Sequence, residues 1–123
     1  MPFKILIVDD SAVIRHCLRS CIEQNPKIVV CGEAENGQVA IDKVKELNPD
    51  VVILDWQMPV MNGLEAARQI AQLAPNASMA LLTLHSEDEI LGLAEAVGVQ
   101  RVFSKSEKLV HLVAWLTTIC TPS

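Results

Sequence analysis

Five short apolar runs divide this chain of 123 residues. They lie at 5–8, 28–31, 51–54, 79–82 and 101–103, and several are continuous rather than alternating. Continuous apolar runs of this length are typical of parallel strands covered on both faces, because side chains on either face avoid water. The runs therefore predict a buried parallel sheet.

Helical patterns separate these runs. The first has apolar residues three or four positions apart, at Ile14, Cys17, Leu18, Cys21 and Ile22. Four similar patterns follow the other runs, and Pro or Gly lies at the end of most of them. Five strands alternating with five helices predict an α/β fold, a doubly wound parallel sheet with helices on both faces. We expect one domain spanning 1–123, with no output domain in this chain.

Composition narrows the range of partners. Half of the residues are hydrophobic, aromatic residues make up 3%, and the net charge is -5. A negatively charged chain repels phosphate backbones and anionic lipids, and few aromatic side chains are present on which nucleic-acid bases could stack. We therefore expect no binding to nucleic acid or membrane. No export signal or membrane span is visible, which predicts a cytoplasmic protein with reduced cysteines.

Polar residues stand at the ends of four of the expected strands. Asp9 and Asp10 follow the first, Asp55 ends the third, Thr83 follows the fourth and Lys105 follows the fifth. The carboxyl ends of parallel strands meet at one edge of the sheet, where ligands bind. Three adjacent carboxylates repel one another unless a cation lies among them, and oxygen ligands suit Mg²⁺. Asp55 would then attack phosphorus as a nucleophile while Thr83 and Lys105 stabilise phosphoryl oxygens.

Four segments, ILIVDDS, VVILDWQMPVMNGLEA, LLTLHS and FSKS, resemble the receiver domain of two-component response regulators over nearly the whole chain. VVCGEAENG and LTLHS are similar to receivers of the NarL/FixJ type, which usually carry a C-terminal helix-turn-helix domain. The resemblance implies a flavodoxin-like sheet of order 2-1-3-4-5. It also implies a phosphoryl donor that is a histidine kinase or phosphotransfer protein, and a change at the surface around the fourth and fifth helices. A homodimer is a further expectation.

The resemblance also implies roles for particular residues. Asp55 matches the phosphoacceptor, Thr83 the switch hydroxyl and Lys105 the phosphate-pairing lysine. The implied Mg²⁺ ligands are Asp9, which acts through water, Asp10, Asp55 and the backbone carbonyl of Gln57.

Several positions depart from the family pattern. Val102 stands where the family often has Tyr or Phe, and Phe103 should point to the opposite face of the strand. Ser106 stands where Pro is common, so a cis peptide bond is not favoured there. Leu84 is bulkier than the usual small residue and would narrow access to Asp55.

The sequence leaves two alternative functions open. One is a docking or dimerisation module that is never phosphorylated. The retention of every acidic and basic group disfavours this module, although Leu84 and Val102 keep it open. Another is a phosphatase with an aspartate nucleophile, which Gln57 disfavours because it stands where such enzymes place a general acid. Gln57 and His85 are candidates for tuning the loss of the phosphoryl group, or are merely exposed polar residues.

Other residues have structural interpretations. Asp10 or Ser11 is expected to cap the first helix, and Met58-Pro59 and Gly63 are as consistent with shaping a turn as with binding a ligand. Core packing is predicted for Cys17 and Cys21 rather than a metal site with His16. Trp115 and residues 107–108 belong to a terminal helix that either forms a partner face or packs ordinarily.

Overall fold

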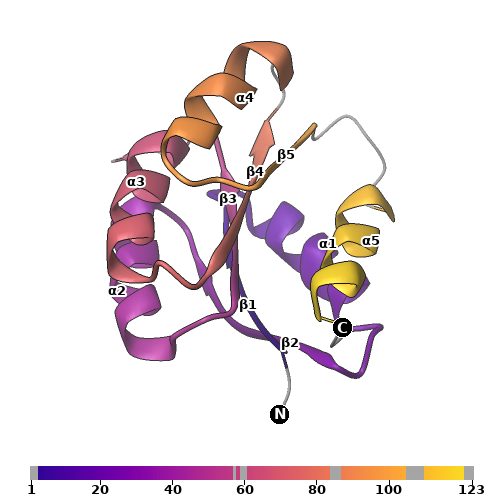
Figure 1. The fold of residues 1–123 in the computed structure, drawn as a ribbon. Helices are drawn as coiled ribbons and strands as arrows, with labels where there is room; N and C mark the ends of the chain where they lie inside the picture. Colours follow the sequence, from indigo (N-terminus) through magenta and orange to yellow (C-terminus); the bar gives the residue numbers. More distant parts are fainter. Residues whose placement is uncertain (1–2, 57, 59–60, 84–86, 105–109, 121–123) are drawn as a thin grey trace.

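The computed structural model describes residues 3–56, 58, 61–83, 87–104 and 110–120. Its strands and helices alternate along the chain (Figure 1). The strands are β1 (Phe3–Val8), β2 (Ile28–Ala34), β3 (Val51–Asp55), β4 (Ser78–Thr83) and β5 (Arg101–Ser104). The helices are α1 (Ala12–Ile22), α2 (Gly37–Leu47), α3 (Gly63–Leu73), α4 (Glu87–Ala96) and α5 (Val110–Cys120).

The five strands form one parallel sheet of order β2-β1-β3-β4-β5. Helices α2, α3 and α4 lie on one side of this sheet, and α1 and α5 lie on the other (Figure 1). The predicted doubly wound fold and its strand order are confirmed. Because the order reverses beside β1, a crevice for ligands is expected where β1 and β3 end.

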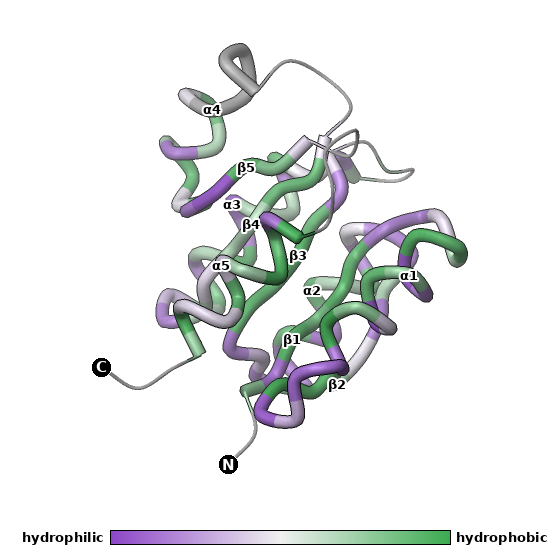
Figure 2. The backbone as a smooth tube through the Cα atoms, turned by 90° about the vertical axis from the view of Figure 1, so that its right-hand side faces the viewer, coloured by the Kyte–Doolittle hydropathy of each residue, from purple (hydrophilic) through white to green (hydrophobic). Residues whose placement is uncertain are grey.

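Two apolar clusters fill the space between the sheet and its helices. In β1, Leu6 packs towards α2 and α3, whereas Ile5 and Ile7 pack towards α1 and α5. Figure 2 shows the central strands as hydrophobic along their length. In β5, Val102 and Phe103 belong to opposite clusters, as predicted from strand alternation. Burial on both faces explains why the apolar runs are continuous.

The edge strand β2 contains one extra residue. Ile5 pairs with Val30 and Leu6 pairs with Gly32, so Cys31 has no counterpart on β1. Such a β-bulge interrupts the alternation of side chains. Val30 therefore packs towards α1 and α5, whereas Ala34, four positions later, packs towards α2 and α3. After the bulge, each side chain of β2 lies on the face opposite to the one that simple alternation predicts.

The predicted core packing of Cys17 is wrong. Leu18 and Ile22 are the buried residues of α1, Cys17 is exposed and Cys21 is partly buried. Consecutive residues are about 100° apart around a helix, so Cys17 lies to the side of the contact that Leu18 makes with the sheet. The apolar stripe of α1 is wider in the sequence than the face that the sheet covers.

Within the described residues, no helix combines the length and the apolar character that crossing a membrane requires.

Candidate functional site

Three carboxylates meet at the carboxyl edge of the sheet. Asp9 follows β1 and Asp55 ends β3, and these strands are neighbours in which Val8 pairs with Leu54. One carboxylate oxygen from each of Asp9, Asp10 and Asp55 lies within 4.8 Å of the other two. The structure thus brings together the three acidic residues that were predicted to meet at the strand ends.

Burial differs among the three acids. Asp9 is fully buried and Asp55 is 3% exposed, whereas Asp10 is exposed. The cluster therefore opens to solvent on the side of Asp10. Three carboxylates so close together, two of them buried, repel one another and destabilise the folded state unless a cation offsets their charge. An all-oxygen donor set suits a hard ion such as Mg²⁺, so these residues fit the metal that the sequence predicts.

The turn after β1 holds Asp9 in place. Its Oδ1 accepts a hydrogen bond from the Ser11 backbone N–H at 2.9 Å, and its own N–H donates to the Ala34 carbonyl at 3.0 Å. Ser11 caps α1, since its hydroxyl accepts from the N–H of Ile14 at 3.3 Å. The acidic turn is thus anchored both to α1 and to the edge strand.

Gly63 lets α3 begin against the end of β3. Its N–H donates to the Trp56 carbonyl at 2.8 Å, and Trp56 in turn donates to the Leu82 carbonyl of β4 at 2.8 Å. A Cβ atom at Gly63 would collide with the backbone of Asp55 and Trp56. Gly63 therefore shapes the turn that follows Asp55, which is the structural alternative raised from the sequence.

Thr83 is buried at the same edge. It is the last residue of β4 and pairs with Ser104, while Asp55 pairs with Leu82, one residue earlier on β4. The predicted residues Gln57 and Lys105 lie outside the described residues, as do Leu84, His85, Ser106 and the segment 107–108.

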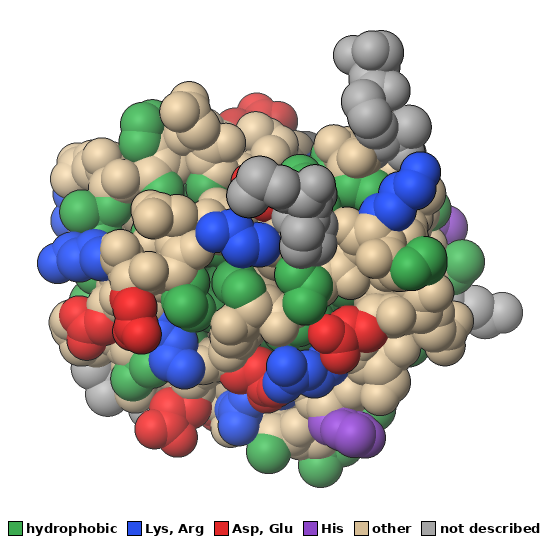
Figure 3. Space-filling view, turned by 90° about the horizontal axis from the view of Figure 1, so that it is seen from below, with side chains coloured by type: hydrophobic (Ala, Val, Ile, Leu, Met, Phe, Trp, Pro, Cys, Tyr) green, Lys and Arg blue, Asp and Glu red, His purple; other side chains and the backbone are tan. Residues whose placement is uncertain are grey.

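The end of the molecule opposite to the acidic cluster has a mixed surface. Acidic and basic side chains of the described residues are interspersed there and form no large patch of one sign (Figure 3).

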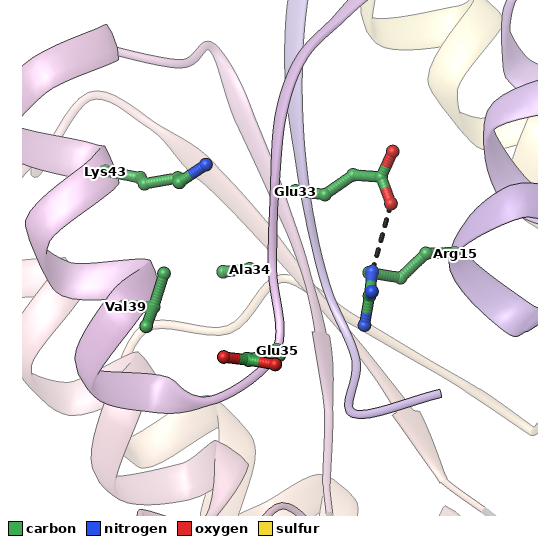
Figure 4. Close-up of a pocket in the computed structure, with 6 residues that line it drawn as sticks. All are labelled: Arg15, Glu33, Ala34, Glu35, Val39 and Lys43. Carbon is green, nitrogen blue, oxygen red and sulfur yellow. Dashed lines mark hydrogen bonds and ion pairs between the residues drawn. The ribbon is translucent and has the colours of Figure 1, made fainter. Parts of the chain in front are cut away.

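Sequence patterns gave no indication of a contact from α1 to the acidic turn. Arg15 donates through Nη1 to the Asp9 carbonyl at 2.6 Å and through Nε to Glu33 Oε1 at 3.0 Å. Both side chains line a hollow of about 230 Å³ beside β2 (Figure 4). Glu33 reaches α1 only because it follows the bulge at Cys31, and no regular alternation signals such a bulge.

A doubly wound sheet with acidic groups at its switch point defines an α/β protein that binds its ligand at the carboxyl edge. The chain belongs to the response regulator receiver domain family, whose model matches residues 5–117. The predicted resemblance is confirmed.

Known relatives agree with this assignment. The chain is 40% identical over 111 residues to the transcriptional regulatory protein YdfI of Bacillus subtilis, covering 88% of this chain and 52% of YdfI. It superposes on a LuxR-family two-component response regulator from Aurantimonas sp. SI85-9A1 with a TM-score of 0.90 and 29% identity, covering 98% of this chain and 86% of that one. For the response regulator domain of Thermotoga maritima CheB the TM-score is 0.85 and the identity 28%, covering 98% and 94%. The chain thus spans about half the length of YdfI.

Proposed function

We propose that this receiver domain is a signalling switch that accepts a phosphoryl group on Asp55 from a histidine kinase or a phosphotransfer protein. The observation that carries the proposal is the convergence of three carboxylate oxygens within 4.8 Å at the end of a buried strand. A carboxylate oxygen of Asp55 attacks phosphorus, and a P–O bond forms as the P–N bond of the donor phosphohistidine breaks. The bonding electron pair returns to the imidazole nitrogen, and the product is an aspartyl phosphate.

The acidic residues around Asp55 would bind the metal ion. Asp9, Asp10 and Asp55, with the backbone carbonyl of Gln57, would hold Mg²⁺. When bound, the ion would offset negative charge on the phosphoryl oxygens. Asp9 is fixed by its hydrogen bonds to Ser11 and Ala34, so the chain offers its carboxylate in one orientation.

The switch itself would involve Thr83 and Lys105. The Thr83 hydroxyl and the Lys105 ammonium would each bind a phosphoryl oxygen, and they gain this contact only in the phosphorylated state. Because Thr83 ends β4 just before α4, a change at this residue would reach the surface around α4 and α5. That surface would control a partner or a C-terminal output domain, and the chain would not act as a turnover enzyme. A single domain over 1–123, a cytoplasmic location and self-association stay predictions.

Phosphorylation by a small donor tests the proposal. The protein is incubated with acetyl phosphate and Mg²⁺, and its intact mass is measured after quenching in acid and in base. We expect a mass gain that survives acid, disappears in base and is absent from Asp55→Asn. A gain of the same size in Asp55→Asn would contradict the assignment of Asp55. No adduct in the unmodified chain would favour a docking module, and rapid turnover of a phosphoester would favour a phosphatase.

A further inference from the structure

A row of alternating charges runs from the acidic cluster along α1 and β2. Arg15 contacts the Asp9 carbonyl through Nη1 and Glu33 through Nε. The other carboxylate oxygen of Glu33 accepts from Arg19 Nη1 at 2.6 Å. The side chains of Arg15 and Glu33 are only 18% and 29% exposed, so solvent screens their ion pair incompletely. Figure 4 shows Glu33 and Arg15 pointing towards one another beside β2.

The position of Arg15 creates a conflict with a metal site. Its guanidinium touches the backbone of Asp9, the residue whose carboxylate belongs to the acidic cluster. Carboxylates are the preferred partners of a guanidinium, which binds them through two parallel hydrogen bonds. An arginine that turned into the cluster would occupy the oxygens that a divalent cation needs.

Glu33 resolves this conflict by providing Arg15 with another carboxylate. The Nε of Arg15 is occupied by Glu33, and its Nη1 is thereby directed at a neutral carbonyl oxygen rather than at the acids. Glu35 lines the same hollow but is exposed, so water screens its attraction for Arg15. Asp9 is fully buried, where attraction between opposite charges is stronger. A released Arg15 would therefore turn towards the cluster.

We propose that Glu33 is a positioning residue that restrains Arg15 and so keeps the acidic cluster open for a divalent cation. This inference rests on the metal site of the proposed function. It depends on the bulge at Cys31, because Glu33 would face α2 if Cys31 paired regularly with β1. Among the described residues, Glu33 forms its ion pairs with Arg15 and Arg19, so it would act on the cluster through Arg15.

A double-mutant cycle tests the restraint. Mg²⁺ is titrated into the unmodified protein, Glu33→Gln, Arg15→Gln and the double variant. The fluorescence of Trp56, adjacent to Asp55, is followed, and calorimetry checks the affinities. We expect Glu33→Gln to weaken Mg²⁺ binding by roughly fivefold or more, because the freed guanidinium competes for the carboxylates. In the Arg15→Gln background the same substitution should change the affinity by less than about twofold, because no arginine is left to release.

Arg19→Gln is the matched control. It removes the other partner of the same carboxylate, but no contact of Arg19 with Asp9 is found among the described residues. It should leave the Mg²⁺ affinity within about twofold of the unmodified protein. Urea unfolding confirms that each variant is folded before titration.

Two results would overturn the inference. Unchanged affinity in Glu33→Gln would show that Arg15 needs no restraint. An equal loss with and without Arg15 would show that Glu33 acts through its own charge or through the fold. If the unmodified protein bound no Mg²⁺, the proposed function would fail, and the inference with it.

Discussion

At Gly63 the chain has no room for a side chain. A Cβ atom there would meet the carbonyl group of Asp55 and lie 2.9 Å from the Cα of Trp56, and both are backbone that cannot rotate away. Gly63→Ala should lower the free energy of unfolding by roughly 2–4 kcal/mol, because α3 must move away from β3. It should also slow phosphorylation, because Asp55 lies at that junction.

Gly92 provides the control for this substitution. It lies in α4, and a Cβ atom there would have no neighbour within 4 Å beyond the backbone of its own helix, so Gly92→Ala should be neutral or stabilise by up to about 1 kcal/mol. Urea unfolding curves of the two variants measure the difference. Equal stabilities would show that the β3–α3 junction adapts to a side chain.

The strand-end rule identified acidic residues without any contact information. Asp9, Asp10 and Asp55 follow or end buried runs, and parallel strands must bring such residues to one edge. The contact between Arg15 and Glu33 was not predictable in this way. It depends on which face of β2 Glu33 occupies, and the residue count of the bulge decides that face.

At the scale of an element, β2 carries a cysteine at its bulge and α1 carries one on its surface. Burial raises the pKa of the Cys31 thiol, with a smaller opposing effect from Lys4. A raised pKa leaves less thiolate at a given pH, and the thiolate is the species that reacts with alkylating agents. Cys17 is exposed on α1. Iodoacetamide should therefore modify Cys17 first, and modification of Cys31 should require a more alkaline solution.

Peptide mass spectrometry of the native protein, sampled over time between neutral and alkaline pH, measures these rates. Unfolding in urea should remove the difference between Cys17 and Cys31, because burial is its cause. Modification of native Cys31 as fast as Cys17 would show that β2 opens readily at its bulge.

Apolar spacing predicts the elements of this fold better than it predicts the width of their buried faces. Five helices and five strands follow from apolar spacing, because each element must bury a face against the next layer. The spacing in α1 placed Cys17 inside, whereas the sheet covers only the face with Leu18 and Ile22. The width of the helix face that the sheet covers depends on where the neighbouring elements lie. The sequence of one helix does not contain the positions of those elements.

For the whole molecule, the proposed metal site predicts that Mg²⁺ raises the free energy of unfolding. Mg²⁺ that binds the folded state alone should stabilise it by about 1.4 kcal/mol at a concentration ten times the dissociation constant. Asp10→Asn should remove most of this gain, and because Asp10 is exposed the substitution should disturb the core little. Thermal unfolding with and without Mg²⁺ measures the gain.

A substitution away from the acidic cluster is the control for Asp10→Asn. Asp42 is exposed on α2, and Asp42→Asn changes the net charge equally while leaving the three acids intact. It should retain the full Mg²⁺-dependent rise in melting temperature. A loss equal to that of Asp10→Asn would indicate diffuse ion binding rather than a defined site.

The bulge at Cys31 also gives the edge strand one residue more than its pairing with β1 requires. Deletion of Cys31 would remove the residue that has no counterpart on β1 and would leave Glu33 opposite Ile7, still facing α1. Regular pairing of every residue of β2 with β1 would instead turn Glu33 from α1 to α2, although neither it nor Arg15 had been substituted. For this contact, the pairing register of the edge strand matters as much as the identity of the two charged residues.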